Sequence, residues 1–131
     1  MTDRAFDELG IKMEMPPHRP TWVDINLDHF VTNLHAIQKR VGPGAKIIGV
    51  VKADAYGHGV DLIETMQDEG VDMMAVAFLD EAIALRQRGI DRSDIMLLGF
   101  TPKEAIPDLV EWDVEPAVYQ YDFAKALSDY C

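Results

Sequence analysis

Apolar runs and helical stretches alternate along most of this chain, and the alternation restricts its fold more than any other feature. Four short runs lack polar alternation, which is typical of strands buried on both faces. The runs span residues 46–51, 75–78, 95–99 and 117–119. Each run is followed by apolar residues at helical spacing. These helical stretches span residues 60–69, 81–88, 103–111 and 121–130. The sequence therefore predicts four successive βα units.

Successive βα units predict a parallel sheet with right-handed crossovers. Equivalent points in the four runs lie about 21 to 27 residues apart, which suits units joined by short loops. Half of a (β/α)8 barrel and a small doubly wound sheet share this periodicity, so the pattern leaves both open. A complete barrel has about 250 residues, whereas this chain has 131. A barrel built from it would be incomplete.

The region before the first unit is expected to hold a leader, a strand and a helix. Residues 1–18 show no sustained periodicity and reach the rest of the chain through a proline pair, so we interpret them as a flexible leader. Residues 22–27 alternate apolar and polar side chains, the pattern of a half-buried strand. Helical spacing then covers residues 30–41.

Two helices have recognisable start signals. Asp28 precedes the helical spacing of the first helix and is its expected N-cap, and Gly42 begins the Gly-Pro-Gly segment that ends it. Thr101, followed by Pro102 and by Glu104 three residues after the threonine, predicts a capping box at the start of the stretch 103–111.

Composition and charge exclude several classes of partner. The chain carries 12 Lys and Arg against 23 Asp and Glu, a formal net charge of −11 without a basic run, so nucleic acid and anionic membranes are poor partners. The first twenty residues contain no apolar stretch as long as a signal peptide core, and the chain contains no apolar run as long as a transmembrane helix, so we expect a cytoplasmic protein. Cys131 is the only cysteine and the four histidines are scattered, so neither a disulfide nor a metal site is expected.

The segment 50–59, VVKADAYGHG, carries the chemistry. It places Lys52 at the carboxyl end of the first buried run, where barrel active sites lie. Desolvation there favours a neutral amine that can form a Schiff base with an aldehyde. Tyr56 offers a hydroxyl donor, and a helix start after Gly57 and Gly59 offers free N–H groups to a phosphate. On pattern alone, a solvated or Asp54-paired surface lysine beside a tight turn remains an alternative.

This segment closely resembles the cofactor-lysine signature of alanine racemases. The similarity extends through residues 19–34 and 75–86, and so covers essentially everything from Arg19 onward. It implies that residues 19–131 are the N-terminal portion of a (β/α)8 TIM barrel, with about four βα units preceded by one strand and one helix. The second half of the barrel and the family's β-rich C-terminal domain, with which the first strand would associate, lie outside this chain.

The resemblance also implies a chemistry. In the family, pyridoxal 5′-phosphate forms an aldimine with the lysine and L- and D-alanine are interconverted, which supplies D-alanine for cell-wall synthesis. Lys52 would hold the cofactor and act as the base on the D-alanine side, and Tyr56 would donate a hydrogen bond to the cofactor phosphate. The second base is a tyrosine from the partner subunit of a homodimer. That tyrosine and the arginine facing the pyridine nitrogen lie beyond this chain, so we expect the 131 residues alone to be inactive.

Three alternatives stay open at this point. A related racemase acting on serine, lysine or another amino acid would share the segment. A non-catalytic protein that binds pyridoxal phosphate also uses a barrel and a Schiff-base lysine, although its family lacks the Tyr-Gly-His-Gly continuation. An interaction or structural fragment is the third alternative.

Overall fold

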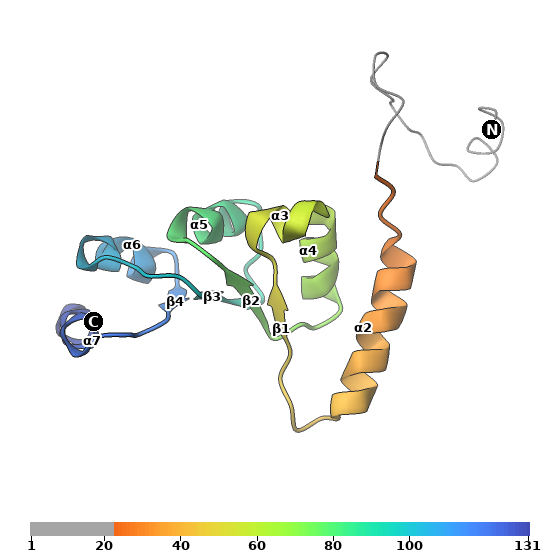
Figure 1. Ribbon diagram of the computed structural model, residues 1–131, viewed down its shortest axis with the longest axis horizontal. Helices are drawn as coiled ribbons and strands as arrows, with labels where there is room; N and C mark the ends of the chain where they lie inside the picture. Colours follow the sequence, from red (N-terminus) through yellow and green to blue (C-terminus); the bar gives the residue numbers. More distant parts are fainter. Residues whose placement is uncertain (1–22) are drawn as a thin grey trace, which may run out of the picture.

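The computed structural model describes residues 23–131, and the expected leader lies outside this part of the chain. Four short parallel strands form one sheet in the order β1-β2-β3-β4 (Figure 1). The strands are β1 (Ile48–Val50), β2 (Met73–Val76), β3 (Asp94–Leu97) and β4 (Val114–Pro116). They are connected by α3 (Lys52–Gly57) and α4 (Val60–Asp68), by α5 (Leu79–Gln87), and by a 3-10 turn, η1 (Lys103–Ala105), that leads into α6 (Ile106–Glu111). Helix α7 (Tyr121–Tyr130) follows β4, and α2 (Leu27–Val41) precedes β1.

The strand order decides between the two architectures that the periodicity allows. A doubly wound sheet reverses its strand order at a switch point, whereas here every strand pairs with the next one along the chain. Right-handed crossovers between strands in this order bring all connecting helices to one face of the sheet. The arrangement is therefore that of part of a (β/α)8 barrel, as predicted.

One face of the sheet forms the core and the other is open. The row that pairs Gly49, Met74, Ile95 and Val114 is buried beneath the helices. On the opposite face Val50 remains 42% exposed. The expectation that the strands are buried on both faces is therefore wrong for β1 within the described residues, because Val50 stays partly exposed there, although its partner Ala75 on β2 is fully buried.

The beginning of the described chain differs from the sequence prediction. Residues 23–26 form no strand, since a strand needs a neighbouring strand for its backbone hydrogen bonds and the described residues supply none here. Helix α2 begins at Leu27, and its N-cap is Asn26, whose side chain accepts a hydrogen bond from His29 N at 2.8 Å. The predicted cap, Asp28, lies inside the first turn. Gly42 ends the helix at a φ of 78°, as expected.

The fourth unit is also shifted. Strand β4 lies at Val114–Pro116, three residues before the predicted run 117–119, because Val114 is the residue that packs into the core. Val118, in the predicted run, is 53% exposed. The predicted capping box is absent: Thr101 is buried, and no side chain caps η1 or α6. Helix α7 has the bounds that the spacing predicts.

Arg86 ties the end of α5 to two neighbouring loops. Its Nε donates to the carbonyl oxygen of Trp112 at 3.1 Å, and its terminal nitrogens donate to those of Ile90 (2.7 Å), Ser93 (2.9 Å) and Asp113 (2.7 Å). One guanidinium thus satisfies four carbonyl groups that no helix or strand partner reaches. The βα units are joined at this end of the sheet by a charged side chain as well as by apolar packing.

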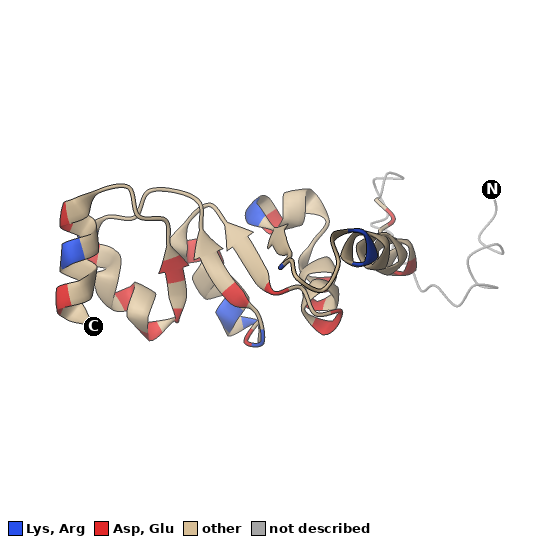
Figure 2. Ribbon diagram, turned by 90° about the horizontal axis from the view of Figure 1, so that it is seen from below, with Lys and Arg blue, Asp and Glu red and all other residues tan. Residues whose placement is uncertain are grey.

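Charged side chains of both signs are spread along the described part of the molecule (Figure 2), and basic ones are not concentrated on one element. Within residues 23–131, no helix is long and apolar enough to cross a membrane. The same residues contain no group of three or more histidine, cysteine, aspartate or glutamate side chains placed to hold a metal ion.

Candidate functional site

Lys52 lies directly after β1, at the carboxyl end of the sheet. The preceding residue, Val51, is buried and its N–H donates to the carbonyl of Ala75 at 2.8 Å, which continues the β1–β2 pairing up to the lysine. The Lys52 side chain is half-buried, and its Nζ lies 6.0 Å from the centre of the Tyr56 ring. Among the described residues it forms no ion pair, so the alternative of a surface lysine paired with Asp54 does not hold.

The four residues after Lys52 form a left-handed helical turn. Ala53, Asp54, Ala55 and Tyr56 have φ between 52° and 58° and ψ between 34° and 53°. L-residues avoid this conformation because Cβ approaches the carbonyl oxygen, at about 1–2 kcal/mol per residue. Four in succession therefore store roughly 4–8 kcal/mol. Strain of this size persists only where surrounding contacts enforce it, and such strain is typical of functional sites.

Local contacts hold part of the turn. The side chain of Ala55 is buried, and its N–H donates to the carbonyl of Val51 at 2.8 Å. The Ala55 carbonyl in turn accepts from the backbone N–H of His58 at 3.2 Å and lies 2.8 Å from the His58 Nδ1. Gly59 N–H closes the turn on the carbonyl of Asp54 at 3.0 Å. Helix α4 then begins at Val60 without a side-chain cap.

The carboxylate of Glu81, in the first turn of α5, links this turn to β2. Its Oε1 accepts from the N–H of Ala53 at 2.8 Å, and its Oε2 accepts from the N–H groups of Ala77 at 2.7 Å and Phe78 at 3.3 Å. Burial raises the pKa of Glu81, but the three N–H donors and the positive charge of Lys52 together lower it by more. The pKa of Glu81 therefore lies below its ordinary value of 4.5.

The ends of the later strands are fixed by close backbone contacts. Gly99 donates to the carbonyl of Ala77 at 3.1 Å, and a Cβ at this glycine would lie only 2.4 Å from the same oxygen. Tyr119 donates from its hydroxyl to the carbonyl of Leu98 at 2.6 Å. This bond ties Tyr119, just after β4, to the residue that follows β3.

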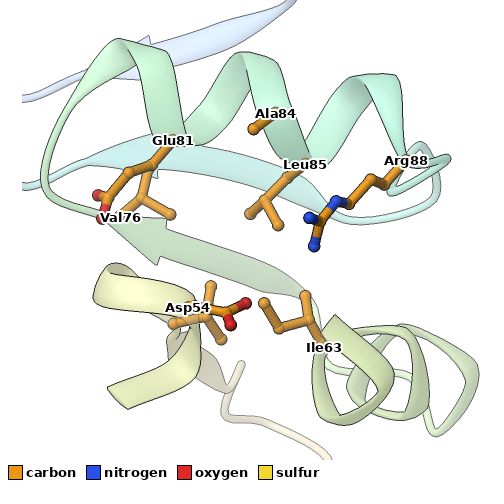
Figure 3. A pocket seen from close by; sticks show the side chains of 8 residues that line it. Asp54, Ile63, Val76, Glu81, Ala84, Leu85 and Arg88 are labelled. Carbon is orange, nitrogen blue, oxygen red and sulfur yellow. The ribbon is translucent and has the colours of Figure 1, made fainter. Parts of the chain in front are cut away.

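Two hollows adjoin the lysine turn. The smaller has a volume of about 220 Å³ and lies between α3 and α5, where Asp54 and Arg88 face it from opposite sides and Glu81 lies at its β2 end (Figure 3). The larger, of about 480 Å³, lies between the start of α2 and β1 and includes Tyr56 and His58 in its lining. Lys52 itself lines neither hollow, and it lies just beyond the carboxyl end of β1.

The groups at this edge fit the chemistry of pyridoxal phosphate. A primary amine without an ionic partner can bond to an aldehyde. Tyr56 is 61% exposed, and its hydroxyl makes no hydrogen bond within residues 23–131, so it is free to donate to a phosphate. The structure thus brings together the two side chains that the sequence analysis singles out, on one turn at one strand end.

Comparison with known proteins gives the family. The family model described as "alanine racemase, N-terminal domain" matches residues 25–131 of this chain. The chain belongs to the alanine racemase N-terminal domain family.

Individual relatives agree with this assignment. The alanine racemase of Clostridium tetani is 46% identical over 112 residues, which are 85% of this chain and 28% of that protein. A solved alanine racemase of Clostridium difficile 630 superposes with a TM-score of 0.79 at 41% identity, over 87% of this chain and 30% of that one. A histidine racemase from Leuconostoc mesenteroides is also similar, with a TM-score of 0.73 and 28% identity over 87% of this chain and 30% of its own. The chain therefore spans less than a third of the length of these relatives.

Two features of the site were missed by the sequence analysis. The segment was expected to be a glycine-flanked turn, and nothing in the letters Lys-Ala-Asp-Ala-Tyr predicts four non-glycine residues in left-handed geometry. Glu81 lies within the stretch 75–86 that carries the resemblance, and no role is predicted for it. Its signal was nevertheless present, because a glutamate in the first turn of a helix that follows a buried strand can reach back to free backbone N–H groups.

Proposed function

We propose that this chain is the lysine-bearing part of an alanine racemase that interconverts L-alanine and D-alanine with pyridoxal 5′-phosphate. The observation that carries the proposal is the position of Lys52. It leaves the carboxyl end of a barrel strand on a strained left-handed turn, and it is half-buried without an ionic partner. Family membership and the match over residues 25–131 support the same conclusion.

Each residue at the edge has a proposed task. Lys52 Nζ would hold the cofactor covalently, and after release it would move a proton at the substrate Cα on the D-alanine side. Tyr56 would bind the phosphate through its hydroxyl and pack its ring beside the lysine. The cofactor, when bound, supplies an electron sink that stabilises negative charge on the substrate Cα. We assign neither the base of the opposite face nor the partner of the pyridine nitrogen to residues 23–131.

The remaining parts of the proposal concern the whole protein. We expect a cytoplasmic homodimer that acts on alanine and supplies D-alanine as a cell-wall precursor, with residues 19–131 as the first part of its barrel domain. The net charge of −11 supports a small-molecule substrate over nucleic acid. A racemase of another amino acid is the second candidate, because the similar protein from Leuconostoc mesenteroides is a histidine racemase.

The test is racemisation by the complete polypeptide that contains this segment. Chiral chromatography should show conversion of L-alanine to D-alanine, and conversion of other amino acids should be much slower. Lys52→Ala should abolish conversion, whereas Lys46→Ala, at an exposed lysine before β1, should leave it unchanged. Equal conversion by the Lys52→Ala protein, or a preference for histidine over alanine, would refute the assignment. The 131-residue chain alone should show negligible activity.

A further inference from the structure

Glu81 makes contacts that the proposed chemistry does not require directly. Its side chain is the one group described here that bonds to the backbone at the carboxyl ends of both β1 and β2. The bond to Ala53 reaches the first residue of the left-handed turn, immediately after Lys52. A helix-cap role alone would need only the bond to Phe78, at the start of α5.

We propose that Glu81 is a positioning residue that holds the left-handed turn and thereby fixes where Lys52 leaves β1. The inference rests on the proposed function of Lys52, but the contacts from which it is argued are hydrogen bonds within this chain. The Ala53 N–H is the donor that the turn presents to α5, and the bond joins the turn to the end of β2. Without the bond, the strain of the turn can be released by rotation of the backbone next to Lys52.

We call the three bonds from Glu81 to Ala53, Ala77 and Phe78 the clamp. It needs both carboxylate oxygens as acceptors. One carboxylate oxygen faces Ala53, and the other faces Ala77 and Phe78. An amide of the same shape has one acceptor and one donor. Glu81→Gln must therefore place its NH2 group against the N–H of Ala53 or against the two N–H groups of β2, and one side of the clamp is lost.

The charged groups around Glu81 are few in the described residues. Lys52 and Asp54 come from α3, and Arg88, which directly follows α5, lies at the far end of the hollow in Figure 3. Strand β2 contributes no titratable side chain. Loss of the three hydrogen bonds on acidification is expected to follow protonation of Glu81, because its carboxylate accepts all three, and Asp54 is the one other carboxyl that lines the hollow.

The first measurement is amide hydrogen exchange of the intact 131-residue chain, without cofactor. In Glu81→Gln, exchange at Ala53 should speed up about tenfold or more, as expected for loss of a hydrogen bond to a charged group. Amides of β2 and β3 should keep their protection. The matched control is Asp80→Asn, which removes one charge from the neighbouring exposed residue of the same helix. Unchanged exchange at Ala53 in Glu81→Gln, or equal acceleration in Asp80→Asn, would overturn the proposal.

The second measurement reports on the lysine. The chain is treated with pyridoxal 5′-phosphate and borohydride, and the label on Lys52 is divided by the label on exposed Lys46 in the same molecule. The ratio should fall severalfold in Glu81→Gln and stay constant in Asp80→Asn. A purely structural role would leave the ratio unchanged while the strands stay protected, and that result would count against positioning.

A pH series covers the case in which Glu81→Gln fails to fold. In the wild-type chain, exchange at Ala53 corrected for its intrinsic pH dependence should accelerate only below pH 4.5, as the carboxylate is protonated. A flat profile would contradict the clamp. Because the exchange experiments contain no cofactor, they can succeed even if the complete polypeptide does not carry pyridoxal phosphate on Lys52, so failure of the proposed function and failure of this inference are separable.

Discussion

Replacing Ala53 by glycine is a direct test of the left-handed turn. Glycine in an ordinary helix is destabilising by about 1 kcal/mol relative to alanine. At Ala53, with φ of 54°, glycine instead relieves the Cβ clash, which is about 1–2 kcal/mol. The gain is offset by about 0.4–1 kcal/mol of extra entropy in the unfolded chain. We therefore expect Ala53→Gly to be neutral or stabilising, by roughly 0–1.5 kcal/mol.

The control is Ala84→Gly. Ala84 is exposed, as Ala53 is, but it lies in the middle of the right-handed helix α5. Ala84→Gly should lower the free energy of unfolding by about 1 kcal/mol, so the two variants should differ in this free energy by roughly 1–2.5 kcal/mol. With a urea slope of about 2 kcal/mol per molar, their unfolding midpoints should differ by roughly 0.5–1.2 M at one protein concentration. Equal destabilisation by both glycines would refute the left-handed geometry.

Four further outcomes are expected. Arg86→Met should lower the free energy of unfolding by roughly 2–4 kcal/mol in urea titrations, because four carbonyl groups lose a charged donor. Gly99→Ala should lower it by roughly 1–3 kcal/mol, since its Cβ would meet the Ala77 oxygen, and a change below the error of thermal melting would contradict that contact. The stabilisation from Glu81 should be complete above pH 4.5 and decline as the pH falls through its lower folded pKa, and Glu81→Gln should remove this step from the pH dependence of the urea midpoint. We expect the exposed apolar side chains of β1 to drive association of the 131-residue chain, so Val50→Lys should shift its sedimentation towards monomer, whereas sedimentation identical to the wild type would contradict this.

The helical part of the fold follows from the sequence because apolar spacing determines which face each helix buries. Helix α7 has the predicted bounds, and α4 and α5 lie within two residues of theirs. The strands are less certain, since a run of apolar residues does not show where hydrogen bonding starts. The shift of β4 to Val114–Pro116 illustrates this limit.

The failed predictions have a common physical cause. The strand at 22–27 and burial of β1 on both faces both require neighbours that residues 23–131 do not contain. A pattern in the sequence reports the environment for which a segment is suited, and the described residues supply only part of that environment. The capping box failed for a local reason, because Thr101 turns into the core and a 3-10 turn precedes α6.

At the site, the sequence predicts which residues matter better than it predicts their geometry. Lys52 and Tyr56 could be named from a strand end, a turn and a resemblance. The conformation of the turn could not, because intrinsic preference argues against left-handed alanine, aspartate and tyrosine. Beside the local contacts, the carboxylate of Glu81 bonds to the turn from another element, and such contacts are invisible in a local pattern.

The assignment of Lys52 as the cofactor lysine is tested most directly by mapping the cofactor itself. The complete polypeptide, isolated from cells that make it, is reduced with borohydride, digested and analysed by mass spectrometry. We predict the reduced pyridoxal phosphate adduct on the peptide that contains Lys52, in near-stoichiometric amount, and none in Lys52→Ala. An adduct spread without preference over exposed lysines such as Lys46 and Lys125, or its absence from the Lys52 peptide, would contradict the account.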